Sequence, residues 1–212
     1  LNLRAKKFGL DIHSKLVAFL PYYASFASKF SLIMNLRDKI PGLPKLSEIF
    51  FGFSAKRPLP QWRRDYFRNN EIPNTINNID KRIPVILFVD TFNRYYEPEN
   101  VRSAIKVLEK AGYFPFIPTP KNPNKILCCG RTFLSNGLID NAKIEANHII
   151  DTFLPYLKQG ISIVGLEPSC ILSFRDELPT LNLGNDFKLI KNNSYTFEEL
   201  LAKKCNPINF KK

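Results

Sequence analysis

The chain has 212 residues, of which 44% are hydrophobic and 24% charged, a balance that is typical of a globular protein and argues against a disordered one. Its formal net charge is +12, and residues 1–70 hold 13 of the 31 Lys and Arg but only 4 of the 19 Asp and Glu. Four unevenly spaced cysteines and no basic, apolar leader argue against a secreted disulfide framework, so we expect a reducing cytoplasm. The uneven charge indicates two segments with different roles.

Residues 1–82 are expected to form a basic arm of helices and loops, interrupted by prolines. Its most apolar stretch, LVAFLPYYASFASKFSLIMNL (16–36), contains Pro21 and Lys29. These residues argue against a membrane span and favour a packed amphipathic helix, while a peripheral membrane contact stays open. Basic and aromatic residues around Trp62 are compatible with nucleic acid, but such a surface more often docks on protein, so we expect no nucleic-acid partner.

From residue 83 the pattern changes to alternating strands and helices. IPVILFVD (83–90) is a continuous apolar run, typical of a strand covered on both faces. Thr196 and Glu199 have the spacing of a helix capping box. The expected strands are 83–90, 113–118 and 161–166 with a weaker one at 187–191, and the expected helices are 100–112, 138–160, one opened by Pro168 and one from Thr196. This alternation predicts an α/β domain with a parallel sheet.

Chemically useful side chains follow the strands of this predicted sheet. Ligands of parallel sheets gather beyond the carboxyl ends of the strands, so these side chains are expected to meet at one edge. The residues after the three main strands are Asp90 and Thr91, then Cys128 and Cys129, then Glu167 and Cys170. The sequence therefore predicts a site at this edge before any chemistry is assigned to it.

The adjacent cysteines call for a specific explanation. A disulfide between neighbours would be strained, and consecutive strand residues point to opposite faces, so Cys128 and Cys129 are not expected to fill one core together. Gly130 is expected to permit a close turn or a close backbone approach. Arg131 either holds an anion or pairs with Glu167 or Asp90. His148, which lies beside an apolar helix face, is expected to be packed or half-exposed instead of binding a metal.

Several motifs together carry a family resemblance. FVDTFNRYYEPE, CCGRTFLSNG, AKIEANHIIDTFLPYLKQG and VGLEPSCILSFRDELP resemble the cysteine-rich CCG domain of iron-sulfur oxidoreductases, a group that includes heterodisulfide reductase subunits and the glycolate oxidase iron-sulfur subunit. The likeness is strongest to the C-terminal part of fused bacterial FAD-binding and iron-sulfur D-2-hydroxyacid dehydrogenases, which act on D-lactate or D-2-hydroxyglutarate. NLRDKIPGLPKLSE in the arm is similar to the stretch that precedes this domain there.

The resemblance implies a three-layer α/β CCG domain over residues 83–207, joined by the arm to upstream FAD and ferredoxin-like domains. It implies that FAD takes a hydride equivalent from the 2-hydroxy acid and that iron-sulfur centres pass electrons to an acceptor. The chain starts at Leu1 and its single methionine is Met34, so we expect a part of a longer oxidoreductase that does not turn over substrate alone.

The resemblance also implies a ligand set. The CCG pattern has five cysteines, and this sequence keeps Cys128, Cys129 and Cys170 but has Thr91 and Glu167 at the other two positions. Cys205 is expected to pack or to lie exposed. Three interpretations of the site stay open: an iron-sulfur cluster, conventionally of the [4Fe-4S] type, bound by the three cysteines with Thr91, Glu167, Asp90 and Arg131 nearby; a site for another metal or for a substrate or partner contact; or a purely structural relic. The competing function is an interaction module that has lost its cluster.

Overall fold

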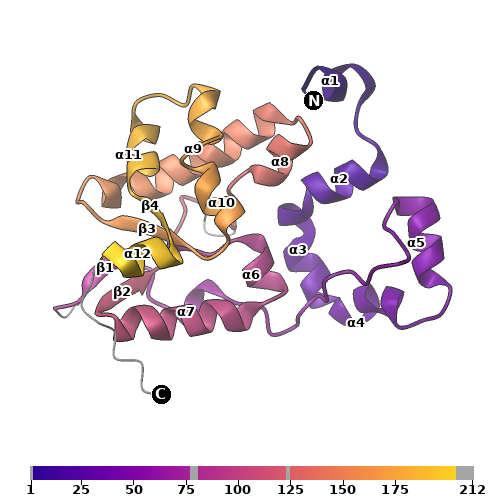
Figure 1. The fold of residues 1–212 in the computed structure, drawn as a ribbon, viewed down its shortest axis with the longest axis horizontal. Helices are drawn as coiled ribbons and strands as arrows, with labels where there is room; N and C mark the ends of the chain where they lie inside the picture. The colour runs from indigo at the N-terminus through magenta and orange to yellow at the C-terminus, as the bar shows by residue number, and fades with distance from the viewer. Residues whose placement is uncertain (1, 77–80, 123–124, 204–212) are drawn as a thin grey trace.

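A computed structural model describes residues 2–76, 81–122 and 125–203, and its centre is a parallel sheet (Figure 1). The strands are β1 (Ile83–Phe88), β2 (Tyr113–Phe116), β3 (Ser162–Gly165) and β4 (Ser194–Thr196), in the order β2-β1-β3-β4. In the central pairings, Ile83 lies opposite Tyr113 and Val85 opposite Ser162. The predicted α/β class with a parallel sheet is confirmed.

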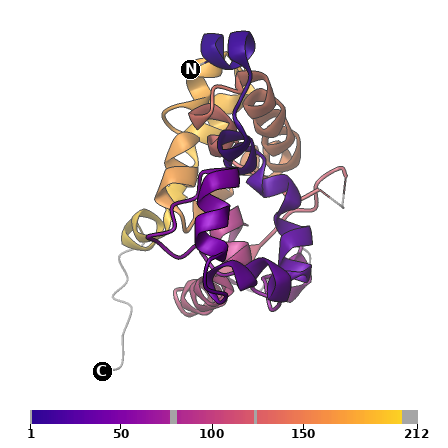
Figure 2. The same cartoon turned by 90° about the vertical axis from the view of Figure 1, so that its right-hand side faces the viewer.

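Helices surround the sheet and also form most of the N-terminal arm. The arm contains α1 (Asn2–Phe8), α2 (Ile12–Ala18), α3 (Leu20–Lys29), α4 (Ser31–Met34), η1 (Asn35–Asp38), α5 (Leu43–Phe51) and η2 (Asn69–Glu71). The rest contains α6 (Thr91–Tyr95), α7 (Pro98–Lys110), α8 (Arg131–Ser135), α9 (Ile139–Leu157), α10 (Pro168–Ser173), η3 (Leu178–Leu181), α11 (Asp186–Asn192) and α12 (Phe197–Lys203). Figure 2 looks onto the arm, with the sheet domain behind it.

The sheet is buried on both faces because alternate strand residues enter two different cores. On one face Ile86 and Phe88 pack with residues of α9, α10 and α11. On the other face Val85 and Leu87 pack with residues of α7 and α12. Sheet and helices thus form three layers, which explains why β1 reads as a continuous apolar run.

Helix α9 is the longest helix among the described residues and lies within the helix predicted at 138–160. Its apolar residues recur at helical spacing, and five of them are buried: Ala142, Ala146, Ile149, Ile150 and Phe153. Pro155 stands inside the last turn, and the helix ends two residues later at Leu157. The same face also buries Glu145, a carboxylate in an otherwise apolar row.

The strand predicted at 187–191 is wrong, because these residues lie in helix α11. Phe187 and Ile190 are buried while Lys188 and Lys191 are exposed, which is the periodicity of a helix face. The fourth strand comes afterwards, as β4. The capping box that follows is confirmed: the Thr196 N–H donates to Glu199 at 3.0 Å, and the Glu199 N–H donates to Thr196 Oγ1 at 3.3 Å.

The arm reaches the sheet domain through its last part and through α3. Phe67 is fully buried in the core beside α7, its N–H donates to the Arg94 carbonyl, and Arg94 Nη1 donates back to the Phe67 carbonyl at 3.1 Å. The apolar stretch 16–36 is divided into separate helices at Phe19 and Phe30. Among the described residues, no helix combines the length and the apolarity needed to cross a bilayer.

A buried carboxylate joins the front of the arm to α9. The Tyr22 hydroxyl donates to Glu145 Oε1 at 2.6 Å, and Lys125 Nζ donates to the same oxygen at 2.9 Å. The other oxygen, Oε2, is buried without a hydrogen-bond partner in the described part of the chain. Burial first, and then the bond to Glu145, raises the pKa of Tyr22, so its hydroxyl stays protonated and donates.

Gly130 makes a turn that the cysteine segment requires. Its φ is +78°, and a Cβ placed there would lie 3.3 Å from the Ala142 backbone, so the expected close approach is confirmed. Gly160 has a similar φ of +81° but nothing within 4 Å of such a Cβ. Substitutions at the two glycines can therefore distinguish the free-energy cost of the backbone conformation from the cost of steric crowding.

We predict that Tyr22→Phe lowers the free energy of unfolding by about 1–3 kcal/mol, because it leaves a buried carboxylate short of a donor. Denaturant unfolding measures this change. Tyr195→Phe is the control, since the Tyr195 hydroxyl makes only exposed contacts, with Lys203 and the Asn192 carbonyl. Equal losses in the two variants would contradict a stabilising Tyr22–Glu145 contact.

We predict that Gly130→Ala destabilises the protein more than Gly160→Ala does. Both substitutions place a side chain in the left-handed region, at about 1–2 kcal/mol each. Only the first also forces a methyl group against α9, which adds about 1–3 kcal/mol. Thermal unfolding of the two variants gives the difference, and the same midpoint in both would show that the close approach at Gly130 is not limiting.

Candidate functional site

The predicted strand-end residues lie around one cavity of about 240 Å³. Its lining includes six of the seven predicted residues: Asp90, Thr91, Cys128, Cys129, Arg131 and Cys170. The parallel pairing of β1 with β3 brings Asp90 and Cys170 to the same edge, and the segment after β2 adds the cysteine pair. Glu167 is not part of the lining, although its neighbour Ser169 is.

The three described cysteines are buried thiols at this cavity, each with 4% of its surface exposed. The sulfurs of Cys129 and Cys170 are 3.1 Å apart, and Cys128 Sγ accepts from the Gly130 N–H at 3.3 Å. Cys128 and Cys129 pack in the same core, so the expectation that both could not fill one core is wrong. The reason is that residues 125–129 have no strand geometry, and the alternation of strand side chains does not apply.

The surroundings of Cys128 and Cys129 keep these two thiols protonated. The hydrogen bond with Cys129, followed by burial, raises the pKa of Cys128 well above its ordinary value. For Cys129 the bond from Cys128 acts to lower the pKa, but the bond to Cys170 and burial outweigh it and raise the pKa well above its ordinary value. Since the thiolate is the nucleophile and the metal ligand, this arrangement disfavours fast thiol chemistry.

The two strand-end acids are engaged at helix N-termini. Asp90 Oδ1 accepts from the N–H groups of Phe92 and Asn93 at 2.9 and 3.0 Å, and Oδ2 accepts from Asn93 Nδ2 at 2.7 Å. Burial raises the pKa of Asp90 against these bonds. Glu167 Oε1 accepts from the backbone and the hydroxyl of Ser169 at 3.3 and 2.7 Å. Both carboxylates therefore stabilise α6 and α10.

Arg131 lines the cavity, but its partner differs from the predicted ones. It forms an ion pair with Glu177, not with Glu167 or Asp90. Those two acids already accept hydrogen bonds at their helix starts, whereas Glu177 follows α10 and lies within reach of Arg131. Glu177 belongs to the stretch FRDEL (174–178), which begins directly after α10.

The arm supplies one wall of the cavity, which the sequence did not predict. Val17 and Pro21 line it, and Thr132 Oγ1 donates to the Ala18 carbonyl at 2.9 Å. The ring of Phe19 packs edge-on against Phe133 at 5.4 Å. The missed Glu145 lies on the same side, and its charge acts on Cys128. The sequence could have indicated its burial, because Glu145 lies between Ala142 and Ile149 on an apolar helix face.

No preformed metal site is present among the described residues, because no three His, Cys, Asp or Glu side chains converge closely enough to hold an ion. His148 is half-buried, as predicted, and His13 packs against the ring of Phe53 at 4.8 Å. Cys205 lies outside the described residues. The cavity lining therefore offers three thiols, several hydroxyls, the Asp90 carboxyl and one guanidinium.

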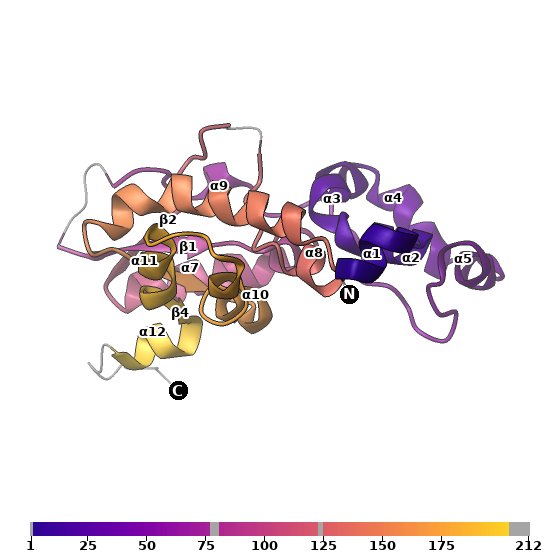
Figure 3. The same ribbon diagram turned by 90° about the horizontal axis from the view of Figure 1, so that it is seen from above.

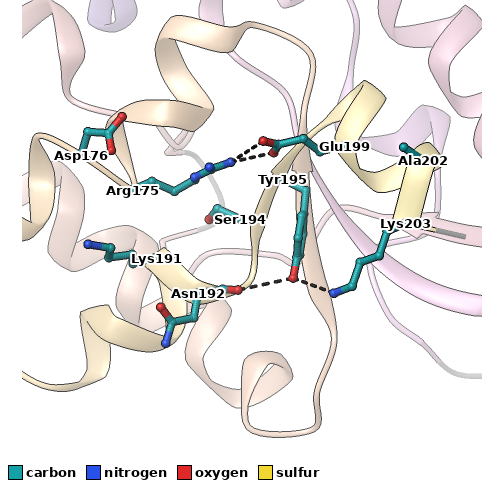
Figure 4. A pocket seen from close by; sticks show the side chains of 9 residues that line it. All are labelled: Arg175, Asp176, Lys191, Asn192, Ser194, Tyr195, Glu199, Ala202 and Lys203. Atoms are coloured by element: carbon teal, nitrogen blue, oxygen red, sulfur yellow. Dashed lines mark hydrogen bonds and ion pairs between the residues drawn. The ribbon is translucent and has the colours of Figure 1, made fainter.

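A second hollow of about 650 Å³ lies beside β4, and none of the predicted site residues lines it (Figure 4). Arg175 Nη1 donates to both carboxylate oxygens of Glu199, at 2.8 and 2.6 Å, and Lys203 Nζ donates to the Tyr195 hydroxyl at 2.7 Å. Two of its cations are thus already engaged by neighbours. The cysteine cavity remains the candidate site.

Comparison with known proteins shows distant relatives among dehydrogenases. The chain is 24% identical over 186 residues to D-2-hydroxyglutarate dehydrogenase of Escherichia coli K12 and 25% identical over the same length to that of Pantoea ananatis. It is 24% identical over 163 residues to one subunit of the anaerobic glycerol-3-phosphate dehydrogenase of Escherichia coli K12. No family model and no solved structure matches the chain significantly.

These matches cover most of this chain but only part of each relative. The matched region is 84% of this chain and 18% of either D-2-hydroxyglutarate dehydrogenase, and 76% of this chain and 40% of the glycerol-3-phosphate dehydrogenase subunit. The chain therefore spans less than a fifth of the length of the first two relatives. It is similar to one part of larger dehydrogenases.

Proposed function

We propose that this chain is the C-terminal CCG module of a flavin-dependent and iron-sulfur D-2-hydroxyacid dehydrogenase, and that it docks the flavin part and the electron acceptor onto each other. The observation that carries the proposal is the gathering of Cys128, Cys129 and Cys170 at one cavity, in a chain similar to D-2-hydroxyglutarate dehydrogenases. The resemblance implies that oxidation of the hydroxy acid takes place at FAD in another part of the enzyme.

A conventional four-thiolate iron-sulfur cluster does not fit the described residues. Such a cluster takes four cysteine ligands, and this edge offers three. Two of the three sulfurs are in direct contact at 3.1 Å, and Glu167 is engaged at the start of α10. Docking is therefore the role that this geometry supports best, and electron transfer through a cluster is the alternative.

We predict that the protein, purified without oxygen, contains no stoichiometric iron or acid-labile sulfide. The reason is the three-thiol donor set, and iron and sulfide analysis with an absorption spectrum measures it. A Cys128→Ser, Cys129→Ser variant is the reference for protein that lacks these ligands. Stoichiometric iron and sulfide with a visible charge-transfer band, lost in this variant, would make the module an electron carrier and refute the docking role.

We predict that a Thr91→Cys, Glu167→Cys variant gains iron and sulfide on anaerobic reconstitution, because it restores thiols at both positions where the CCG pattern has them. The ultraviolet and visible spectrum and metal analysis report the gain. The same two substitutions in the Cys128→Ser, Cys129→Ser background are the control and should bind none. If the variant with all five thiols also stays iron-free while folded, the resemblance to CCG ligand positions is wrong.

A further inference from the structure

The exposed apolar side chains of this molecule are concentrated in the arm. Of the 18 large apolar residues that are exposed in the described part of the chain, 15 lie between Leu3 and Phe51. The three outside the arm are Ile83, Phe92 and Ile144. Such a concentration exceeds the scattered apolar residues of an ordinary protein surface and marks an interaction surface.

Helix α5 shows that this surface needs a partner. None of its nine residues is buried, and Leu46, Ile49 and Phe50, which share one helix face, are 49, 75 and 63% exposed. A helix of this length is marginal in water and gains its stability from packing an apolar face. Figure 3 shows α5 at the end of the molecule farthest from the sheet, so the sheet domain does not cover this face. We call Leu46, Ile49 and Phe50 the α5 patch.

A second group of exposed apolar residues lies on α3 and α4. The rings of Phe26 and Phe30 are 4.6 Å apart and are 64 and 46% exposed. Leu32 and Ile33 follow at 65 and 66%. These four residues form the α3–α4 patch. Pro21, five residues before Phe26 on α3, lines the cysteine cavity, so the patch begins about 7.5 Å along the helix axis from that wall and on a different face of the helix.

Charge indicates the character of the partner. Lys29, Lys39 and Lys45 lie on or between the two patches, and no acidic side chain of the described residues is within ion-pair distance of them. A second copy of this chain would bring the same positive charge and is disfavoured. A bilayer favours a helix with a cationic face, whereas α5 has one Lys and one Glu. The charge pattern thus favours a protein surface with an acidic rim.

We propose that the α5 patch and the α3–α4 patch bind the flavin-bearing part of the same dehydrogenase, through an apolar surface with acidic residues at its rim. This inference rests on the proposed docking function and names its partner and its contact residues. The same arm covers one side of the cysteine cavity. A flavoprotein bound to the α3–α4 patch therefore lies next to the strand-end edge and not at the far side of the sheet.

The test measures binding between the chain of 212 residues and the proposed partner, the flavin-bearing part of the dehydrogenase expressed without these residues, by isothermal titration calorimetry. Ile49→Ser, Phe50→Ser is expected to weaken binding by about tenfold or more, because it removes exposed apolar anchors. Ile83→Ser, Ile144→Ser is the matched control, with similarly exposed residues outside the arm, and is expected to stay within about twofold of the native chain. Circular dichroism checks that both variants fold.

A charge pair of variants tests the acidic rim. Lys29→Glu, Lys45→Glu is expected to weaken binding and to reduce its dependence on salt, whereas Lys106→Glu, Lys110→Glu on α7 is expected to leave both unchanged. Vesicles of phosphatidylglycerol and phosphatidylcholine, and sedimentation of the chain alone, complete the test. Equal binding by arm and control variants would place the partner elsewhere and overturn this inference while the docking function stands.

The remaining outcomes each contradict the proposal in a different way. No binding to the flavoprotein would overturn both the inference and the proposed function. Vesicle binding that only the arm variants lose would assign the patches to a lipid surface instead. Self-association that only the arm variants lose would assign them to a second copy. Either of these results, without flavoprotein binding, contradicts the proposal.

Discussion

The parallel pairing of β1 with β2 and β3 is the constraint on which the site depends. Parallel strands all end at the same edge, so the residues after each strand are brought together however far apart they lie in the sequence. Asp90, Cys129 and Cys170 meet at one cavity for this reason. The pairing itself is stabilised by burial of both sheet faces, which α9 and α7 cover from opposite sides.

The residues at this edge have structural roles, whatever chemistry they also carry out. Asp90 and Glu167 accept hydrogen bonds at the starts of α6 and α10, and the three thiols are packed in the core with α9. Gly130 lets the cysteine segment approach α9 without a collision. At this edge the acids are engaged at helix starts and the thiols are packed in the core, which suits a contact surface better than a site that must bind and release substrate.

Much of this arrangement could be predicted from the sequence, because it follows from periodicity. The run at 83–90, the helix at 138–160 and the capping box at Thr196 depend only on local spacing, and their positions were predicted within a few residues. FKLIK was misassigned because five apolar and basic residues fit a strand as well as a helix turn. The partner of Arg131 and the burial of Glu145 depend on how distant loops run, and no local pattern encodes that path.

The arm wall at Val17 and Pro21 also determines the dielectric environment of the sulfurs. With the arm in place, Cys128 and Cys129 are buried, and burial disfavours the thiolate form of both. Water admitted by a displacement of α2 and α3 would stabilise the ionised form and increase the nucleophilicity of Cys128 and Cys129. The reactivity of these cysteines is therefore a property of the arm's position as much as of the cysteines themselves.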